Sequence, residues 1–203
     1  MTRPSMLLLA SLALLAGPAM AKTHARGPAR DANLADGRCI IIKSMSPKGQ
    51  NLYLDGLMDG PHRTVFMAKT RLPGAIWKLR AVKWGSEQMY QLSNRGPSKY
   101  WLDGVTEKPD GDFPAKSMVR LVKNEGGAEG PNWRITRRAG AGRKASPYYV
   151  FEIQHGDGPN RVLDGMTVAP NNPAFLSAAD PAAPGQRWEI LPQKTCPVAY
   201  PRG

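Results

Sequence analysis

Two short segments of the chain place an aromatic residue two positions before an aspartate. Tyr53 precedes Asp55 in one of them. Trp101 precedes Asp103 in the other. Residues two apart in a strand share a face of the sheet, so each ring would lie beside its carboxylate. On an exposed face, the ring can stack on a sugar while the carboxylate accepts hydrogen bonds from sugar hydroxyls. A third segment of this kind carries Asp164 without a ring.

A cluster of cations forms a second candidate site, in a connection rich in Gly and Ala. Its members are Arg134, Arg137, Arg138, Arg143 and Lys144. Such a cluster can bind sulfate or phosphate groups, with an affinity that falls as the salt concentration rises. The alternative is a solvated loop that binds nothing. The formal net charge of +12 favours anionic partners.

The residue types that usually perform catalysis are scarce and scattered. The three histidines, His24, His62 and His155, lack the spacing of metal ligands. No Gly-x-Ser-x-Gly motif is present. We therefore predict no catalytic residue, no bound metal and no cofactor.

A threefold repeat indicates which elements position these residues. The tripeptide Leu-Asp-Gly occurs three times, at 54–56, 102–104 and 163–165. Each copy is followed, at nearly equal intervals along the chain, by a tryptophan in an alternating apolar segment: Trp77, Trp133 and Trp188. The Leu should point into the core, and the Gly should allow a positive φ or a close approach of the backbone. The repeats span about 39–86, 87–146 and 147–196.

Each repeat contains four segments with strand periodicity, separated by Gly, Pro, Asn and Asp. The predicted strands are 39–45, 52–57, 64–70 and 76–83; 88–93, 99–105, 117–123 and 132–138; and 148–154, 160–166, 174–178 and 187–193. Twelve strands in three matching sets predict an all-β chain folded as one β-trefoil with a pseudo-threefold axis, over 39–203. A β-propeller is the next alternative, but it usually has four or more blades.

The pattern of Leu-Asp followed by Gln-x-Trp resembles the ricin B-type β-trefoil lectins. The resemblance covers nearly the whole chain after residue 38, and Gln186-Arg187-Trp188 reproduces the Gln-x-Trp motif in full. It implies a glycan-binding protein in which Asp55, Asp103 and Asp164 accept hydrogen bonds from sugar hydroxyls.

The first residues resemble a secretory signal peptide, because Arg3 precedes a short apolar run that ends in Ala19-Met20-Ala21. We predict a signal peptide over 1–21, a flexible basic leader over 22–38 and no transmembrane anchor. The protein would be secreted or periplasmic. Export favours a disulfide between the two cysteines, Cys39 and Cys196. That bond would make the first and last strands neighbours.

The leading hypothesis is a secreted, non-enzymatic glycan-binding module, as the targeting subunit of a toxin or of another secreted assembly. One alternative is a protein-binding trefoil, such as a secreted protease inhibitor. Another is a binder of polyanions such as heparin, through the cation cluster. The expected partners are a glycan or an anionic surface ligand and other subunits of a secreted complex. Nucleic acid is not expected.

Overall fold

A computed structural model of the chain describes residues 31–47, 51–56, 65–69, 71, 73–94, 100–105, 118–123, 132–140, 145–153, 161–165 and 173–196. The predicted signal peptide and residues 22–30 lie outside these ranges. The described part consists of strands, with three short 3-10 turns, so the all-β prediction is confirmed. No helix in this part is long and apolar enough to cross a membrane.

Twelve strands fall into three sets of four. The first set is β1 (Cys39–Ser44), β2 (Tyr53–Gly56), β3 (Val65–Ala68) and β4 (Ile76–Trp84). The second is β5 (Glu87–Asn94), β6 (Tyr100–Val105), β7 (Met118–Lys123) and β8 (Trp133–Arg138). The third is β9 (Tyr148–Ile153), β10 (Arg161–Asp164), β11 (Phe175–Ala178) and β12 (Trp188–Pro192). Every strand begins and ends within two residues of its predicted range.

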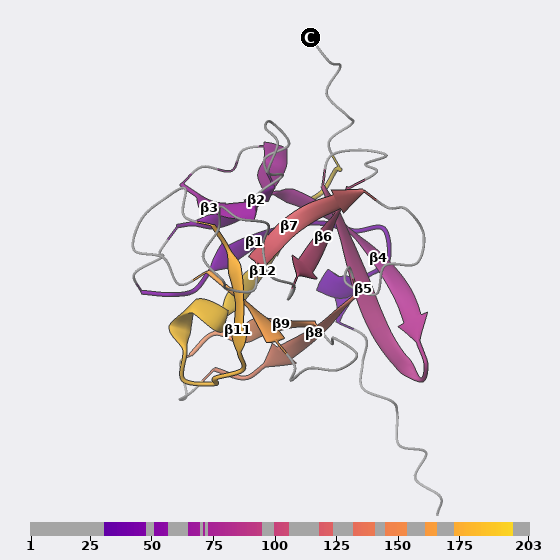
Figure 1. Cartoon of the computed structure of the whole chain (residues 1–203). Coiled ribbons are helices and arrows are strands. Elements are labelled where there is room, and N and C mark those ends of the chain that lie inside the picture. Colours follow the sequence, from indigo (N-terminus) through magenta and orange to yellow (C-terminus); the bar gives the residue numbers. More distant parts are fainter. Residues whose placement is uncertain are drawn as a thin grey trace, which may run out of the picture.

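Six strands pair in a closed ring. The pairs are β1 with β4, β4 with β5, β5 with β8, β8 with β9, β9 with β12, and β12 with β1. The other six form the hairpins β2–β3, β6–β7 and β10–β11, which join the ring through β1, β5 and β9 (Figure 1). Closure of the ring leaves its strands without an unpaired edge. A threefold axis relating the three sets stays a prediction.

The three repeated tryptophans make the same contact in each set. Their side chains are fully buried, and each indole N–H donates a hydrogen bond to the carbonyl of the Leu in the preceding Leu-Asp-Gly. The pairs are Trp77 with Leu54 at 2.9 Å, Trp133 with Leu102 at 2.9 Å and Trp188 with Leu163 at 3.1 Å. A buried indole needs such an acceptor. Because each Trp lies in a ring strand and each Leu in a hairpin strand, the hydrogen bond links a hairpin to the ring.

The glycines of the repeated tripeptide serve close packing. A Cβ added to Gly165 would lie 2.5 Å from the ring of Trp188, and one on Gly56 would lie 3.0 Å from that of Trp77. A Cβ on Gly104 would lie 2.7 Å from Leu176. Positive φ angles of described glycines occur elsewhere, at Gly37 and Gly85. Of the two roles predicted for these glycines, the structure therefore shows close approach.

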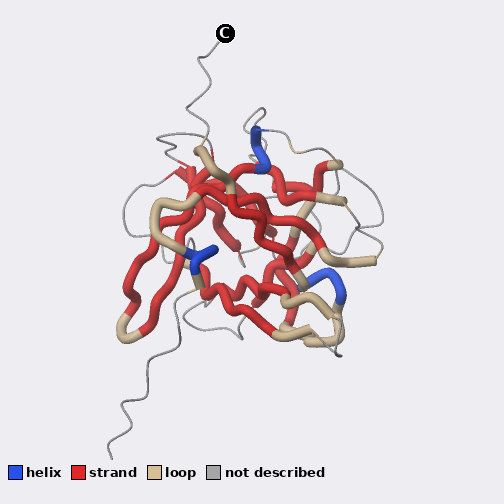
Figure 2. Tube along the Cα trace, turned by 180° about the vertical axis from the view of Figure 1, so that it is seen from behind, coloured by secondary structure: helices blue, strands red, loops and turns tan. Residues whose placement is uncertain are grey.

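Residues 31–38 differ from the predicted flexible leader, because they are held against the ring. The turn η1 (Ala32–Leu34) puts Leu34 into the core. Figure 2 shows the short helical segments in blue among the strands. Asp31 accepts a hydrogen bond of 2.7 Å from the Tyr149 hydroxyl, and Asp36 accepts one of 2.8 Å from the backbone N–H of Ala81. The folded part thus begins at Asp31 at the latest.

The Tyr149 phenol makes the attachment of residues 31–38 sensitive to pH. Burial raises the pKa of Tyr149, to which the hydrogen bond to Asp31 also contributes. The folded protein holds the phenol proton more tightly than the unfolded chain does. The contribution of the protonated phenol to the free energy of unfolding is therefore full below the ordinary tyrosine pKa of about 10. It is lost as the pH rises through the higher pKa of the folded state.

We expect the free energy of unfolding to fall as pH rises above about 10, and to fall less steeply in Tyr149→Phe. At pH 8 that variant should be less stable by about 1 kcal/mol, because it loses the hydrogen bond to Asp31. Urea unfolding between pH 8 and 11 measures both effects. Equal pH dependence in the two proteins would show that Tyr149 is not the source.

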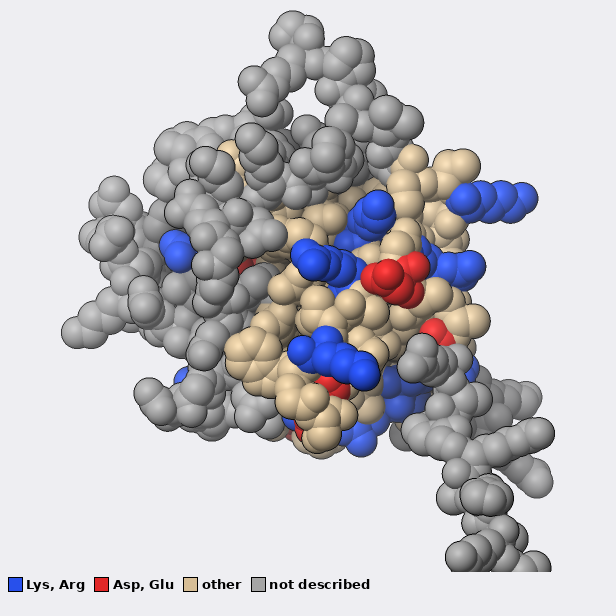
Figure 3. Space-filling view, turned by 90° about the vertical axis from the view of Figure 1, so that its right-hand side faces the viewer, with Lys and Arg blue, Asp and Glu red and all other residues tan. Residues whose placement is uncertain are grey.

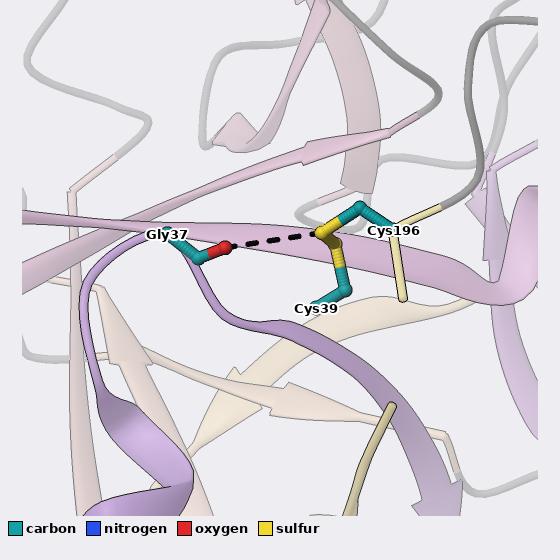
Figure 4. The surroundings of a disulfide bond; sticks show 3 residues. All are labelled: Gly37, Cys39 and Cys196. Atoms are coloured by element: carbon teal, nitrogen blue, oxygen red, sulfur yellow. Dashed lines mark hydrogen bonds between the residues drawn. A yellow bond between two sulfur atoms is a disulfide. The ribbon is translucent and has the colours of Figure 1, made fainter. Parts of the chain in front are cut away.

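The predicted disulfide is confirmed. Cys39, at the start of β1, is bonded to Cys196, which follows β12, and their Cα atoms are 5.4 Å apart (Figure 4). The Cys196 sulfur also lies 3.8 Å from the carbonyl oxygen of Gly37. The bond therefore closes the ring covalently where β1 pairs with β12.

Candidate functional site

A chain of buried polar side chains lies at the Asp of the third Leu-Asp-Gly. The Ser177 hydroxyl donates a hydrogen bond of 2.8 Å to Asp164 Oδ2. The Gln186 amide donates one of 2.7 Å to the Ser177 oxygen and one of 2.8 Å to the carbonyl of Ala178. Asp164 and Gln186 are 4% and 5% exposed. The chain therefore fixes both side chains in a site of low water access.

Strand register and a short turn position these three groups. In the β10–β11 hairpin, Val162 faces Ser177 and Asp164 faces Phe175, so Asp164 and Ser177 share one face of the hairpin. Gln186 ends η3 (Pro184–Gln186). Its amide oxygen accepts a 2.8 Å hydrogen bond from the backbone N–H of Asp180, which anchors the preceding loop.

A groove of about 310 Å³ lies beside this chain, and Gln186 forms part of its wall. The other lining side chains that matter chemically are Tyr148, Glu152, Arg138 and Arg187. The Arg187 guanidinium lies over the Tyr148 ring, 5.4 Å from its centre. The aromatic ring and both kinds of charge give this groove hydrogen-bond donors and acceptors next to an apolar surface. The amide of Gln186 is already hydrogen-bonded to Ser177, Ala178 and Asp180, so it shapes the wall.

The first aromatic and carboxylate pair is not arranged as predicted. Tyr53 is 8% exposed and packs with Ile41 and Ala75, and the Arg71 guanidinium lies 5.4 Å from its ring centre. The prediction of an exposed ring is therefore wrong for Tyr53, because this outer face of the sheet carries a second small apolar cluster. Asp55 is buried against the backbone of Gly74.

The second pair lies in β6. Trp101 is half-buried, and its indole N–H has no hydrogen-bond partner among the described residues. Asp103 is buried and faces Arg120 across the β6–β7 hairpin. A role for Trp101, Asp55 or Asp103 in glycan binding stays a prediction.

The described members of the predicted cation cluster have different surroundings. Arg134 forms salt bridges with Glu87 and with Glu152, at 3.4 Å from the latter, and the hydrogen bond to Glu87 raises the pKa of Arg134. The exposed Arg137 lies 3.9 Å from Asp31. Arg138 lines the groove. Two members of the cluster, Arg143 and Lys144, lie outside the described residues.

Other predictions concern parts of the chain that the structure does not describe. The three histidines, His24, His62 and His155, all lie there. Within the described ranges, no group of three or more His, Cys, Asp or Glu side chains could hold a metal ion.

Sequence reasoning missed Ser177, Tyr148 and Arg187. The available signal for Ser177 was strand periodicity, which places it two residues after Phe175 on the face of Asp164. Tyr148 and Arg187 lie on β9 and just before β12. Only the pairing of those two strands brings them together.

No protein-family model and no curated protein matches this chain. Several solved structures are similar to it. A mosquitocidal holotoxin shares 17% identity over 79% of this chain and 18% of its own, with a TM-score of 0.59. The Polyporus squamosus lectin, bound to the human-type influenza-binding epitope Neu5Aca2-6Galb1-4GlcNAc, shares 11% identity over 77% of this chain and 49% of its own, with a TM-score of 0.55. The Rhizoctonia solani agglutinin shares 17% identity over 78% of this chain and 97% of its own, with a TM-score of 0.51.

At these identities the likeness shows the fold, which is that of the β-trefoil lectins. The resemblance to ricin B-type lectins is thus supported at the level of the fold. The chain spans about half the length of the Polyporus lectin and less than a fifth of the toxin chain.

Proposed function

We propose that this chain is an exported, non-enzymatic carbohydrate-binding β-trefoil module, and that its sugar site is in the third set of strands. The observation that carries the proposal is the Asp164–Ser177–Gln186 chain. It links an aspartate, the sugar-binding residue by resemblance, through Ser177 to Gln186, which lines a groove together with Tyr148. The likeness to a lectin and an agglutinin supports the same function.

Two further observations support parts of this proposal. The Cys39–Cys196 disulfide fits a protein that folds in an oxidising compartment. The similarity to one portion of a holotoxin chain supports a targeting role within a larger secreted assembly. In that role the module would bind a cell-surface glycan, while another part of the assembly would carry the activity.

A glycan array with the disulfide-bonded protein tests the proposal. We expect selective binding of one group of glycans, reduced about tenfold or more in Asp164→Asn, because the amide replaces one acceptor oxygen with a donor. Asp55→Asn and Asp103→Asn are matched controls, since they make the same change at the other two Leu-Asp-Gly copies.

The controls should keep binding if the third set carries the site. Thermal unfolding of all three variants must show that each is folded, because the three aspartates are buried. An array of neutral glycans without signal from the folded protein would refute the sugar site in the third set. Loss of binding in Asp55→Asn or Asp103→Asn alone would place the site in another set.

A further inference from the structure

The outer face of β4 carries two cations and an exposed tryptophan in one line. Lys78, Arg80 and Trp84 alternate with the fully buried Trp77 and Leu79, so they share the face that points away from the core. Trp84 is 49% exposed. Among the described residues, no other large hydrophobic side chain is exposed. A single exposed ring is ordinary on a protein surface, so the feature to explain is its place in line with two cations.

The charges on this face are not neutralised by the rest of the described structure. Lys43, Arg134 and Arg137 each lie within 4 Å of a carboxylate oxygen. No such ion pair links Lys78 or Arg80 to any described residue.

The acid nearest to Trp84 along the hairpin is already neutralised. Glu87 faces Trp84 across the β4–β5 hairpin, but its carboxylate is bound by Arg134. Asp36 also contacts β4, through the backbone N–H of Ala81, but it forms no ion pair with Lys78 or Arg80. Neither acid therefore pairs with the two cations of this face. Figure 3 shows this side of the molecule, on which Lys and Arg gather around a few acidic residues.

Pairing within the hairpin fixes the spacing of these three residues along β4. Residues 78 to 84 are paired one by one with β5, and the two-residue turn at Gly85 and Ser86 begins with a φ of 59° at Gly85, as in a type II′ turn. At roughly 3.3 Å per residue, Lys78 and Arg80 are about 7 Å apart along the strand and Trp84 lies about 13 Å beyond Arg80. The hairpin extends beyond the neighbouring strands in both views (Figures 1 and 2).

We propose that Lys78, Arg80 and Trp84, here named the β4 strip, bind a linear anionic polysaccharide. The two cations would pair with sulfate or carboxylate groups along the polymer, and the Trp84 ring would stack on a sugar further along it. A single exposed ring offers too little apolar area to insert into a lipid bilayer. The β4 strip is separate from the groove beside Gln186, so this proposal stands independently of the site in the third set.

Binding to immobilised heparin tests the β4 strip. We expect Lys78→Gln/Arg80→Gln to weaken binding about tenfold near 0.1 M salt and to reduce the slope of log affinity against log salt by about two. The matched control is Lys69→Gln/Arg120→Gln, which removes two exposed cations outside β4. The control should keep an affinity several-fold above that of the β4 variant. Equal losses in both variants would mean that net charge alone attracts heparin, and would overturn the proposal.

Trp84→Ala separates stacking from charge. It should weaken heparin binding several-fold while leaving the salt slope unchanged, because no cation is removed. Heparin should also reduce acrylamide quenching of tryptophan fluorescence in the wild-type protein, and this protection should disappear in Trp84→Phe, which keeps both cations. Unchanged binding by Trp84→Ala, or no protection from quenching, would overturn the assignment of the ring.

The class of ligand is tested by competition. Sulfated heparin should displace the bound protein, whereas desulfated heparin, single-stranded DNA of equal charge and phosphatidylserine vesicles should compete at least tenfold less well. Equal or better competition by DNA or vesicles would replace the polysaccharide with that ligand. Heparin binding through the β4 strip by a protein silent on a neutral glycan array would refute only the site in the third set.

Discussion

Removing the disulfide should lower the melting temperature of this protein by about 8 to 20 °C. Cys39 and Cys196 are separated by 157 residues. Closing so long a loop in the unfolded chain stabilises the folded state by about 4 to 5 kcal/mol in the chain-entropy account. For a domain of this size, each kcal/mol changes the melting temperature by about 2 to 4 °C. Thermal unfolding of Cys39→Ala/Cys196→Ala, followed by circular dichroism, measures the effect.

The native protein in a reducing buffer is the control for this variant. Both should melt at similar temperatures, since both lose the same covalent link. In an oxidising buffer, the melting temperature of the double variant should stay low, because the variant has no cysteines to pair. A melting temperature unchanged by either treatment would show that pairing of β1 with β12 holds the ring shut without the bond.

Replacing any of the three buried tryptophans with phenylalanine should cost about 2 to 4 kcal/mol of stability. The change removes indole volume from a fully buried position, and it leaves a buried Leu carbonyl without its N–H donor. The variants are Trp77→Phe, Trp133→Phe and Trp188→Phe, each measured by urea unfolding.

Trp84→Phe is the matched control, because it makes the same substitution at an exposed ring. Its stability should stay within about 0.5 kcal/mol of the wild-type value. Losses at only one or two of the buried positions would contradict the equivalence of the three sets. They would indicate instead that the repeats have diverged in how they support the core.

The fold could be read largely from the sequence because its information is local and repeated. Period-two alternation located the strands, and three copies of Leu-Asp-Gly and Trp divided them into sets. The number of cysteines left one possible disulfide partner for each. Residues 31–38 escaped this reasoning, because a single buried side chain, Leu34, gives no periodicity.

The candidate site was harder to predict than the fold. Alternation showed which side of the strand Tyr53 occupies, yet that side is covered by Ile41 and Ala75. The cation cluster was read as a unit along the chain, but Arg134 reaches Glu87 on a different strand. In both cases, contacts between residues distant in sequence decided whether a side chain can meet a ligand.

The sequence by itself determined the all-β class, the strand boundaries, the disulfide and the Leu-Asp-Gly copies. It could do so because backbone periodicity and residue spacing are properties of short segments. Only the tertiary structure decided that Asp164, Ser177 and Gln186 meet beside a groove, and that Lys78, Arg80 and Trp84 stay exposed and unpaired with described carboxylates. The physical reason is that solvent access and charge pairing depend on which strands pack together, which no short segment specifies.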